Sequence, residues 1–206
     1  MAYQSNNNKG LRLPRNKKEW ITFIIIVLVT LAVSGVEGLS SLFTNQTTTV
    51  NPSDQNTSLV ENFDGTNFSI FQPMEHIPVE FVKAVDGDTA VVELNGYQIR
   101  LRYLMIDTPE IGDSPQPFAL DARDRNRQLL SQAQNITIAF DQGPKTDNYD
   151  RALVYVYADG VNILETLLQE GLASVRYVNP PNNSLEDQFR DIQGQAQDQT
   201  LGIWSN

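Results

Sequence analysis

From residue 78 onward the chain carries short runs in which hydrophobic and polar residues alternate, separated by turn-forming residues. Five such runs occur, at residues 79–85, 89–94, 97–106, 135–140 and 152–158. Alternation with a period of two is typical of half-buried strands. Asn95-Gly96 joins the second run to the third, and this dipeptide favours the tight turn of a β-hairpin. The pattern therefore predicts five strands, of which the second and third form a hairpin.

Three further stretches have the features of helices. One follows Pro117, one begins at Asn162 as its N-cap and ends near Gly171, and one begins with the capping-box-like sequence of residues 184–187. In the first helix the candidate buried residues are Ala119, Ala122, Leu129 and Leu130. The order of strands and helices predicts an α+β domain over residues 78–206, a five-stranded OB-fold β-barrel with three packed helices. Periodicity by itself also allows another α+β arrangement.

The N-terminal part of the chain has a different pattern. Residues 1–19 hold five basic residues and one acidic residue, and an uncharged apolar run of 17 residues follows at 20–36. A basic flank before an apolar run favours insertion with the N-terminus in the cytoplasm. We therefore expect residues 1–19 to be a basic cytoplasmic N-terminus and residues 20–38 to be a transmembrane anchor.

Two alternatives to an anchor remain open. A helix over 17 residues spans about 25 Å, against about 30 Å of hydrocarbon core, so the run is marginal for a span. Ala32-Val-Ser34 also fits a signal-peptide cleavage site, and a buried core helix is a third interpretation. The anchor and the signal peptide both predict export. The folded part would then be held outside a cell membrane as a single-pass protein, or secreted after cleavage.

Residues 39–77 are expected to be a polar flexible linker. Ser, Thr, Asn and Gln dominate residues 40–58, and such a composition buries too little apolar area to offset the entropy lost on ordering. His76, near the end of this segment, is expected to be a surface histidine. The linker would therefore separate the hydrophobic segment from the barrel as a disordered connection.

Composition restricts the possible chemistry. The chain of 206 residues contains no cysteine and one histidine, so disulfides, thiolate zinc sites and any reaction that needs two imidazoles are excluded. The net charge of −10 argues against a protein that coats nucleic acid by bulk charge. Neither heptads nor an obvious interface stripe occurs, so a monomer is expected. Carboxylates, arginines, tyrosines and a hard metal ion remain as candidate functional groups.

Three polar stretches are candidates for a site: residues 85–89, 100–110 and 145–152. Each also has an ordinary structural interpretation, as an Asp-rich turn, a strand end and a surface loop. Asp88, Asp107 and the backbone carbonyl of Thr108 are hard oxygen ligands of the kind that bind Ca²⁺. The three stretches together can therefore supply part of a calcium site.

The same stretches contain the other groups that phosphodiester hydrolysis needs. Without a usable histidine the base must be a carboxylate, and Glu110 lies two residues after Thr108. Arg102 and Arg151 can each donate two hydrogen bonds to phosphate oxygens. A metal ion, a base and two guanidinium groups around one centre would stabilise the negative charge of the transition state.

These motifs resemble the thermonuclease (staphylococcal-nuclease-like) family. The resemblance extends from about residue 82 to 205 and includes V-D-G-D-T, R-Y-L-M-I-D-T-P-E, T-D-N-Y-D-R, V-Y-V-Y-A-D-G, Y-V-N-P-P-N-N and L-G-I-W-S in this order. It implies an OB-fold barrel with three helices. It also implies a Ca²⁺-dependent nuclease that cleaves DNA and RNA with little sequence preference, prefers single strands and leaves 3′-phosphates and 5′-hydroxyls.

The resemblance further implies a role for each candidate residue. Asp88 and Asp107 would be side-chain ligands of Ca²⁺, Thr108 would contribute its carbonyl, and Asp86 would lie close behind them. Glu110 would be the general base or would orient the attacking water. Of the remaining residues, Arg102 would bind the scissile phosphate, Arg151 would stabilise the transition state, and Tyr149 and Tyr177 would contact the neighbouring phosphate.

Three departures from the family pattern are expected to weaken binding of nucleic acid. Asn148 replaces a lysine before the loop tyrosine, Asn179 replaces a second tyrosine, and Asp113 lies in a shortened segment that otherwise carries lysines. The catalytic set is complete, so an exported nuclease is the leading hypothesis. The alternatives are a catalytically inactive OB-fold module that binds nucleic acid or protein at the cell surface, and a Ca²⁺-stabilised structural domain.

Overall fold

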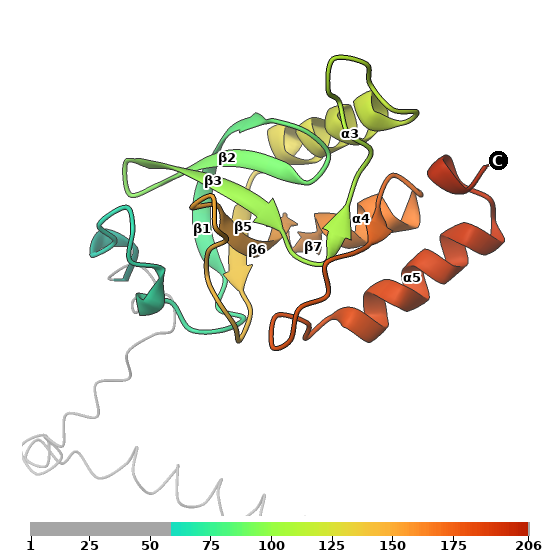
Figure 1. Ribbon diagram of the computed structural model, residues 1–206. Helices are drawn as coiled ribbons and strands as arrows, with labels where there is room; N and C mark the ends of the chain where they lie inside the picture. Colours follow the sequence, from blue (N-terminus) through green and yellow to red (C-terminus); the bar gives the residue numbers. More distant parts are fainter. Residues whose placement is uncertain (1–58, 206) are drawn as a thin grey trace, which may run out of the picture. The chain divides into compact units, whose positions relative to one another are not determined.

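The computed structural model describes residues 59–205. Five strands form a closed barrel: β1 (Ile77–Ala84), β2 (Thr89–Leu94), β3 (Tyr97–Tyr103), β5 (Ile136–Phe140) and β6 (Ala152–Ala158). The pairs β1–β2, β2–β3, β5–β6 and β1–β5 are antiparallel, and the parallel pair β3–β6 closes the ring. Figure 1 shows this barrel with α4 and α5 side by side next to it. The predicted OB-fold barrel is therefore confirmed.

The turn that joins β2 to β3 follows from local sequence. Asn95 and Gly96 have φ angles of 49° and 78°, as a type I′ hairpin turn requires. The third strand is shorter than expected, because it ends at Tyr103 and Met105 adopts a φ of 60°. The chain leaves the barrel there and forms β4 (Ile106–Asp107), which pairs with β8 (Ser174–Val175). This turn moves Asp107 off the barrel strand.

The three helices are α3 (Ala119–Gln132), α4 (Ile163–Gln169) and α5 (Glu186–Asp198). Asn162, in the short strand β7 (Val161–Asn162), caps α4 as predicted, since its Oδ1 accepts a hydrogen bond of 3.0 Å from the Leu164 amide. The predicted capping box of α5 is wrong. Leu185 is the N-cap residue and makes no side-chain cap, because Ser184 donates its hydroxyl to the buried carboxylate of Asp141 instead.

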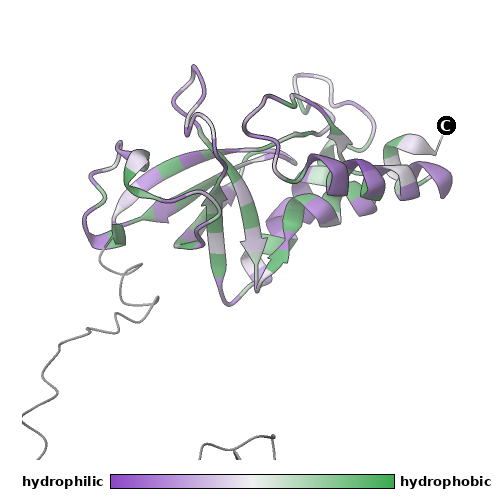
Figure 2. Ribbon diagram, turned by 90° about the horizontal axis from the view of Figure 1, so that it is seen from below, coloured by the Kyte–Doolittle hydropathy of each residue, from purple (hydrophilic) through white to green (hydrophobic). Residues whose placement is uncertain are grey.

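Hydrophobic side chains from the strands and from α4 form one core. Figure 2 shows that hydrophobic residues recur along the strands and predominate in α4, whereas α5 is mostly hydrophilic. The fully buried large side chains include Tyr103, Tyr155, Phe140, Phe189, Leu101 and Ile138. Of the buried positions expected in α3, Ala119, Ala122 and Leu130 are buried and Leu129 is partly buried.

The prediction of a flexible linker is wrong for residues 59–77. Phe63, Phe68 and Phe71 in this segment are only 2%, 6% and 1% exposed, and Phe68 belongs to the short 3₁₀ helix η1 (Phe68–Ile70). The rings of Phe68 and Phe71 lie 5.3 and 6.1 Å from the ring of Phe140 in β5. The polar composition belongs to the preceding residues 40–58, and the phenylalanines that follow it extend the barrel core.

The other N-terminal predictions fall outside the described residues. They concern the basic N-terminus, the hydrophobic segment of residues 20–38 and the linker up to residue 58. Within residues 59–205, no helix combines the length and the hydrophobicity needed to cross a membrane. The single histidine, His76, is exposed as expected, and its Nδ1 lies 2.9 Å from the hydroxyl of Thr137.

Candidate active site

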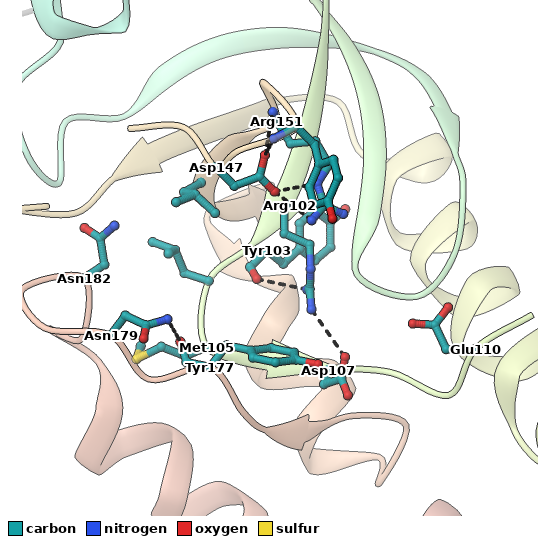
Figure 3. A pocket seen from close by; sticks show the side chains of 13 residues that line it. Arg102, Tyr103, Met105, Asp107, Glu110, Asp147, Arg151, Tyr177, Asn179 and Asn182 are labelled. Atoms are coloured by element: carbon teal, nitrogen blue, oxygen red, sulfur yellow. Dashed lines mark hydrogen bonds and ion pairs between the residues drawn. The ribbon is translucent and has the colours of Figure 1, made fainter. Parts of the chain in front are cut away.

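A cavity of about 590 Å³ opens beside β3, where loops from three parts of the chain meet. Figure 3 shows its lining, in which Arg102, Asp107, Glu110, Arg151 and Tyr177 surround one space. The remaining lining residues are Tyr103, Leu104, Met105, Asp147, Tyr149, Leu153, Asn179 and Asn182. Polar groups therefore converge from β3, from the loop before β6 and from the loop before α5.

Arg102 lies between two of the predicted metal ligands. Its Nη1 is 3.0 Å from Asp88 Oδ1, and its Nη2 is 3.3 Å from Asp107 Oδ1. Nη1 also donates to the backbone carbonyl of Ile106 at 2.9 Å. The side chain is 13% exposed, so these contacts hold the guanidinium group in one place at the cavity wall.

Asp88 is the most buried carboxylate of this group, at 6% exposed. Its Oδ2 accepts hydrogen bonds from the amide and the hydroxyl of Thr108, at 2.9 and 3.2 Å. Burial raises the pKa of Asp88 to about 6; Arg102 opposes this shift, and the neighbouring carboxylates Asp86 and Asp107 add to it. Three carboxylates beside one guanidinium group leave this region with excess negative charge.

A glycine makes the sharp corner between β1 and β2 possible. A Cβ atom on Gly87 would lie 2.6 Å from the Thr108 side chain and 2.7 Å from the Ala122 Cβ atom. The buried side chain of Asn126 in α3 braces the same corner, because it donates to the Asp86 carbonyl at 2.9 Å and accepts from the Tyr103 hydroxyl at 2.9 Å. The V-D-G-D-T motif therefore places Asp88 through close packing against α3.

Asp147 holds the second arginine of the cavity. Asp147 Oδ2 lies 2.7 Å from both Nε and Nη2 of Arg151, and Oδ1 accepts from the amides of Tyr149 and Arg151. Burial by itself raises the pKa of Asp147, but the hydrogen bonds from Arg151 and Tyr149 outweigh it and the net shift lowers the pKa. Sequence analysis missed this residue, although its spacing of four from Arg151 was visible within residues 145–152.

Each arginine is accompanied by an exposed tyrosine. The guanidinium carbon of Arg102 lies 5.6 Å from the ring centroid of Tyr177, and that of Arg151 lies 5.6 Å from the ring of Tyr149. The two tyrosines are 65% and 77% exposed, so their rings remain accessible to a ligand. Exposed aromatic rings over guanidinium groups suit a ligand that has both phosphates and flat bases.

Asn182, which sequence analysis also missed, fixes the loop that carries Tyr177. Its Oδ1 accepts from the Gly143 amide at 2.6 Å, and its Nδ2 donates to the Pro144 carbonyl at 2.8 Å. Asn182 is 4% exposed, so both bonds are shielded from water. No single-sequence signal distinguishes it from the other asparagines of that loop, because both partners lie about 40 residues earlier in the chain.

Glu110 is exposed and faces the cavity across from Arg102 (Figure 3). Its backbone is held by Gln116, whose Oε1 accepts from the Glu110 amide and whose amide donates to the Glu110 carbonyl, both at 3.0 Å. Across residues 59–205 the structure gives its carboxylate neither a hydrogen bond nor an ion pair. This carboxylate is therefore available to accept a proton.

Six of the nine predicted site residues line the cavity: Arg102, Asp107, Glu110, Tyr149, Arg151 and Tyr177. The other three lie behind Arg102, where Asp88 pairs with its guanidinium group, Thr108 donates to Asp88 and the Oδ1 of Asp86 accepts from the Asp88 amide. The structure thus brings all three predicted stretches together in space.

The donor set suits a hard cation with only part of its shell supplied by side chains. In the described part of the chain no group of three acidic or histidine side chains is arranged as a metal site. Asp88 and Asp107 nevertheless converge on one guanidinium group, which shows that both carboxylates face the same cationic position. A divalent cation there would need backbone oxygens and waters as further ligands.

The fold and the cavity together define an OB-fold protein with a site suited to phosphate groups. The chain belongs to the staphylococcal nuclease homologue family, whose model matches residues 100–206. It is 39% identical over 197 residues to endonuclease YncB of Bacillus subtilis (strain 168), an alignment that covers 92% of each chain.

Two further relatives cover only parts of the sequences compared. SPbeta prophage-derived endonuclease YokF of the same organism is 44% identical over 134 residues, which is 64% of this chain and 45% of YokF. The thermonuclease of Staphylococcus hyicus is 34% identical over 128 residues, 61% of this chain and 74% of that protein. This chain therefore spans less than half the length of YokF.

Proposed function

We propose that this protein is an exported, Ca²⁺-dependent nuclease that hydrolyses phosphodiester bonds of DNA and RNA with little sequence specificity. The observation that carries the proposal is the cavity itself, in which two guanidinium groups and an unpaired carboxylate face one space. The names of the relatives, endonuclease and thermonuclease, support the same reaction class.

In this proposal Arg102 and Arg151 bind the phosphate that reacts. Both are already fixed by carboxylates, so little conformational entropy is lost when the phosphate binds. A guanidinium group donates parallel hydrogen bonds that match two phosphate oxygens. As negative charge builds up on these oxygens in the transition state, the two cations stabilise it more strongly than the ground state.

Glu110 acts as the general base or orients the attacking water. Its carboxylate is exposed and unpaired among the described residues, so a water bound to it can approach the phosphorus. A carboxylate that takes the water's proton while the phosphorus–oxygen bond forms lowers the activation free energy of the attack. The leaving 5′-oxygen receives a proton in turn, and in this proposal Arg151 assists that step. The product keeps a 3′-phosphate.

The implied metal ion fits the residues present. Asp88, Asp107 and the carbonyl of Thr108 would hold Ca²⁺, and Asp86 adds negative charge behind them. When bound, Ca²⁺ would act as a Lewis acid toward a phosphoryl oxygen. Tyr149 and Tyr177 would contact the phosphate next to the scissile one, and their exposed rings favour a single-stranded substrate, whose bases can stack.

The remaining parts of the proposal concern location and assembly. The basic N-terminus and residues 20–38 would hold the domain outside the membrane, or the domain would be secreted after cleavage. The domain would act as a monomer. Both points rest on the sequence pattern.

The full-length chain in mild detergent provides the test. Single-stranded DNA and RNA are incubated with Ca²⁺ or with EGTA, and the product ends are identified. We expect cleavage that needs Ca²⁺, leaves 3′-phosphates and falls by about 10²-fold or more in Glu110→Gln. Glu80→Gln, an exposed residue of β1 outside the cavity, is the matched control.

Two other outcomes would contradict the proposal. Binding of DNA without hydrolysis would indicate the inactive OB-fold module. A melting temperature that rises with Ca²⁺, with neither binding nor hydrolysis, would indicate a structural domain that is stabilised by the metal.

A further inference from the structure

A second, smaller hollow of about 230 Å³ adjoins the cavity. Three residues line it, Arg100, Tyr149 and Arg151, and the last two also line the main cavity. The two hollows therefore share a wall made of one tyrosine ring and one guanidinium group. Arg100 contributes to the smaller hollow alone.

Arg100 is positioned by the strand that also carries Arg102. Residues two apart on a strand point to the same face and are separated by about 6.6 Å. The parallel register of Leu101 with Ala152 places Arg100 beside Arg151, the residue just before β6. The spacing of Arg100 and Arg102 along β3 is comparable to the distance between adjacent phosphates in an extended single strand of nucleic acid.

The charge around Arg100 differs from that around the other two arginines. Arg102 and Arg151 are paired with Asp88, Asp107 and Asp147. Arg100 is exposed, and none of the ion pairs in the described part of the chain involves it. A phosphate can therefore bind Arg100 without displacing a carboxylate.

Arg100 lies in a domain with an excess of acidic residues. Residues 80–206 carry 10 basic and 19 acidic residues. Among the described residues, the exposed arginines Arg127 and Arg190 have a carboxylate partner, whereas Arg100 and Arg176 have none. Tyr149 lines both the main cavity and the hollow that Arg100 lines, and it is 77% exposed, so its ring is accessible to a base between two phosphates.

We propose that Arg100 is a further residue of the subsite beside Tyr149, where it binds the phosphate one nucleotide away from the scissile phosphate of a single-stranded substrate. This inference rests on the proposed function for the identity of the substrate. It adds a residue that selects substrates by length, because a ligand with a single phosphate cannot occupy both positions.

Equilibrium binding tests the subsite separately from catalysis. The ligands are dithymidine monophosphate and its forms with one additional phosphate, at the 5′ or the 3′ end. Titration calorimetry with Ca²⁺ uses the full-length chain carrying Glu110→Gln, so that no ligand is consumed. The quantity compared is the gain in affinity that the terminal phosphate confers.

We expect one of the two phosphorylated forms to bind about 10-fold more tightly than the unphosphorylated ligand, as one charge-assisted contact provides. Adding Arg100→Gln should reduce this gain to near unity. The matched control is Arg127→Gln, which removes the same charge from an exposed residue of α3 and should preserve the gain. Circular dichroism confirms that both variants fold.

The outcomes separate this inference from the proposed function. A gain that persists in Arg100→Gln, or no gain for either phosphorylated form, overturns the subsite. Hydrolysis by the wild-type chain together with either result leaves the nuclease proposal intact. An Arg100-dependent gain in a wild-type protein that hydrolyses nothing supports the subsite and refutes the nuclease.

Discussion

Both Nε and Nη2 of Arg151 lie 2.7 Å from the same carboxylate oxygen, Oδ2 of Asp147. The other oxygen of Asp147 accepts the backbone amides of Tyr149 and Arg151. One side chain therefore fixes both the loop and the guanidinium group that it presents to the cavity. Because Asp147 acts through Arg151, it is a positioning residue in the proposed reaction.

Removal of the Asp147 charge should affect catalysis through Arg151. Asp147→Asn is expected to lower kcat by about 10- to 100-fold, because Arg151 would no longer be held in the position from which it contacts the transition state. In an Arg151→Gln background the same substitution should have little further effect, because the two residues act as one unit. Single-turnover rates of the four proteins measure this coupling. Additive losses would show that Asp147 supports the fold alone.

Gly87→Ala should destabilise the corner that holds Asp88. The added Cβ atom would lie within 2.7 Å of the Thr108 side chain and the Ala122 Cβ atom, so we expect a loss of about 1–3 kcal/mol in the free energy of unfolding. Urea denaturation measures the change. Gly194→Ala in α5 has open space around the new atom and should stabilise the protein by about 0.5–1 kcal/mol. Equal effects of the two substitutions would contradict the steric argument.

The stability of the domain should depend on the ionised form of Asp141. Burial by itself raises the pKa of Asp141, but hydrogen bonds from Ser184, Tyr155 and the Gln142 amide outweigh it, and the net shift lowers the pKa below its ordinary value of 3.8. A lowered pKa in the folded state means that the ionised carboxylate stabilises the fold above the unfolded pKa. This contribution is lost as the pH falls through the lowered pKa.

Asp141→Asn should therefore reduce the free energy of unfolding at neutral pH, and the difference from wild type should shrink as the pH falls below about 4. Urea denaturation at pH values from about 3 to about 7 follows this change. Asp113→Asn, at an exposed position, controls for the loss of one charge. A difference that is independent of pH would sink the interpretation.

The phenylalanines of residues 59–77 should contribute as much as barrel residues do. Phe71→Ala is expected to cost about 3–5 kcal/mol, the range for truncation of a buried ring. Val161→Ala, at a residue that is 58% exposed, should change stability by about 0.5 kcal/mol or less. Denaturant midpoints of the full-length variants compare them. A small effect of Phe71→Ala would instead support the prediction that this segment is part of a flexible linker.

The acidic domain should respond weakly to salt. Residues 80–206 have a net charge of −9, so screening relieves the repulsion between domain and substrate while it weakens the arginine contacts. We expect a high Michaelis constant and a shallow or reversed dependence of activity on NaCl. Initial rates across a salt series provide the measurement. A steep loss of activity, as for a strongly basic nuclease, is the contrary result.

Local patterns were sufficient for much of the fold. The alternation of residues 89–94 and 152–158 predicted β2 and β6 with their observed bounds. Asn95-Gly96 and Asn162 act as predicted because their turn and cap involve only neighbouring residues. Segments with long-range partners were predicted less well. Ser184 is an example, because it bonds to Asp141, 43 residues away, instead of capping α5.

The sequence by itself determined which groups are present: the carboxylates, the two arginines and the tyrosines, each beside a predicted strand or turn. Only the tertiary structure decided their partners. The parallel pairing of β3 with β6 brings Arg102 and Arg151 to one cavity, and Asp147 and Asn182 become visible as supports only there. Periodicity and turn chemistry arise between neighbours in the chain, whereas a site depends on which distant segments the closed barrel brings together.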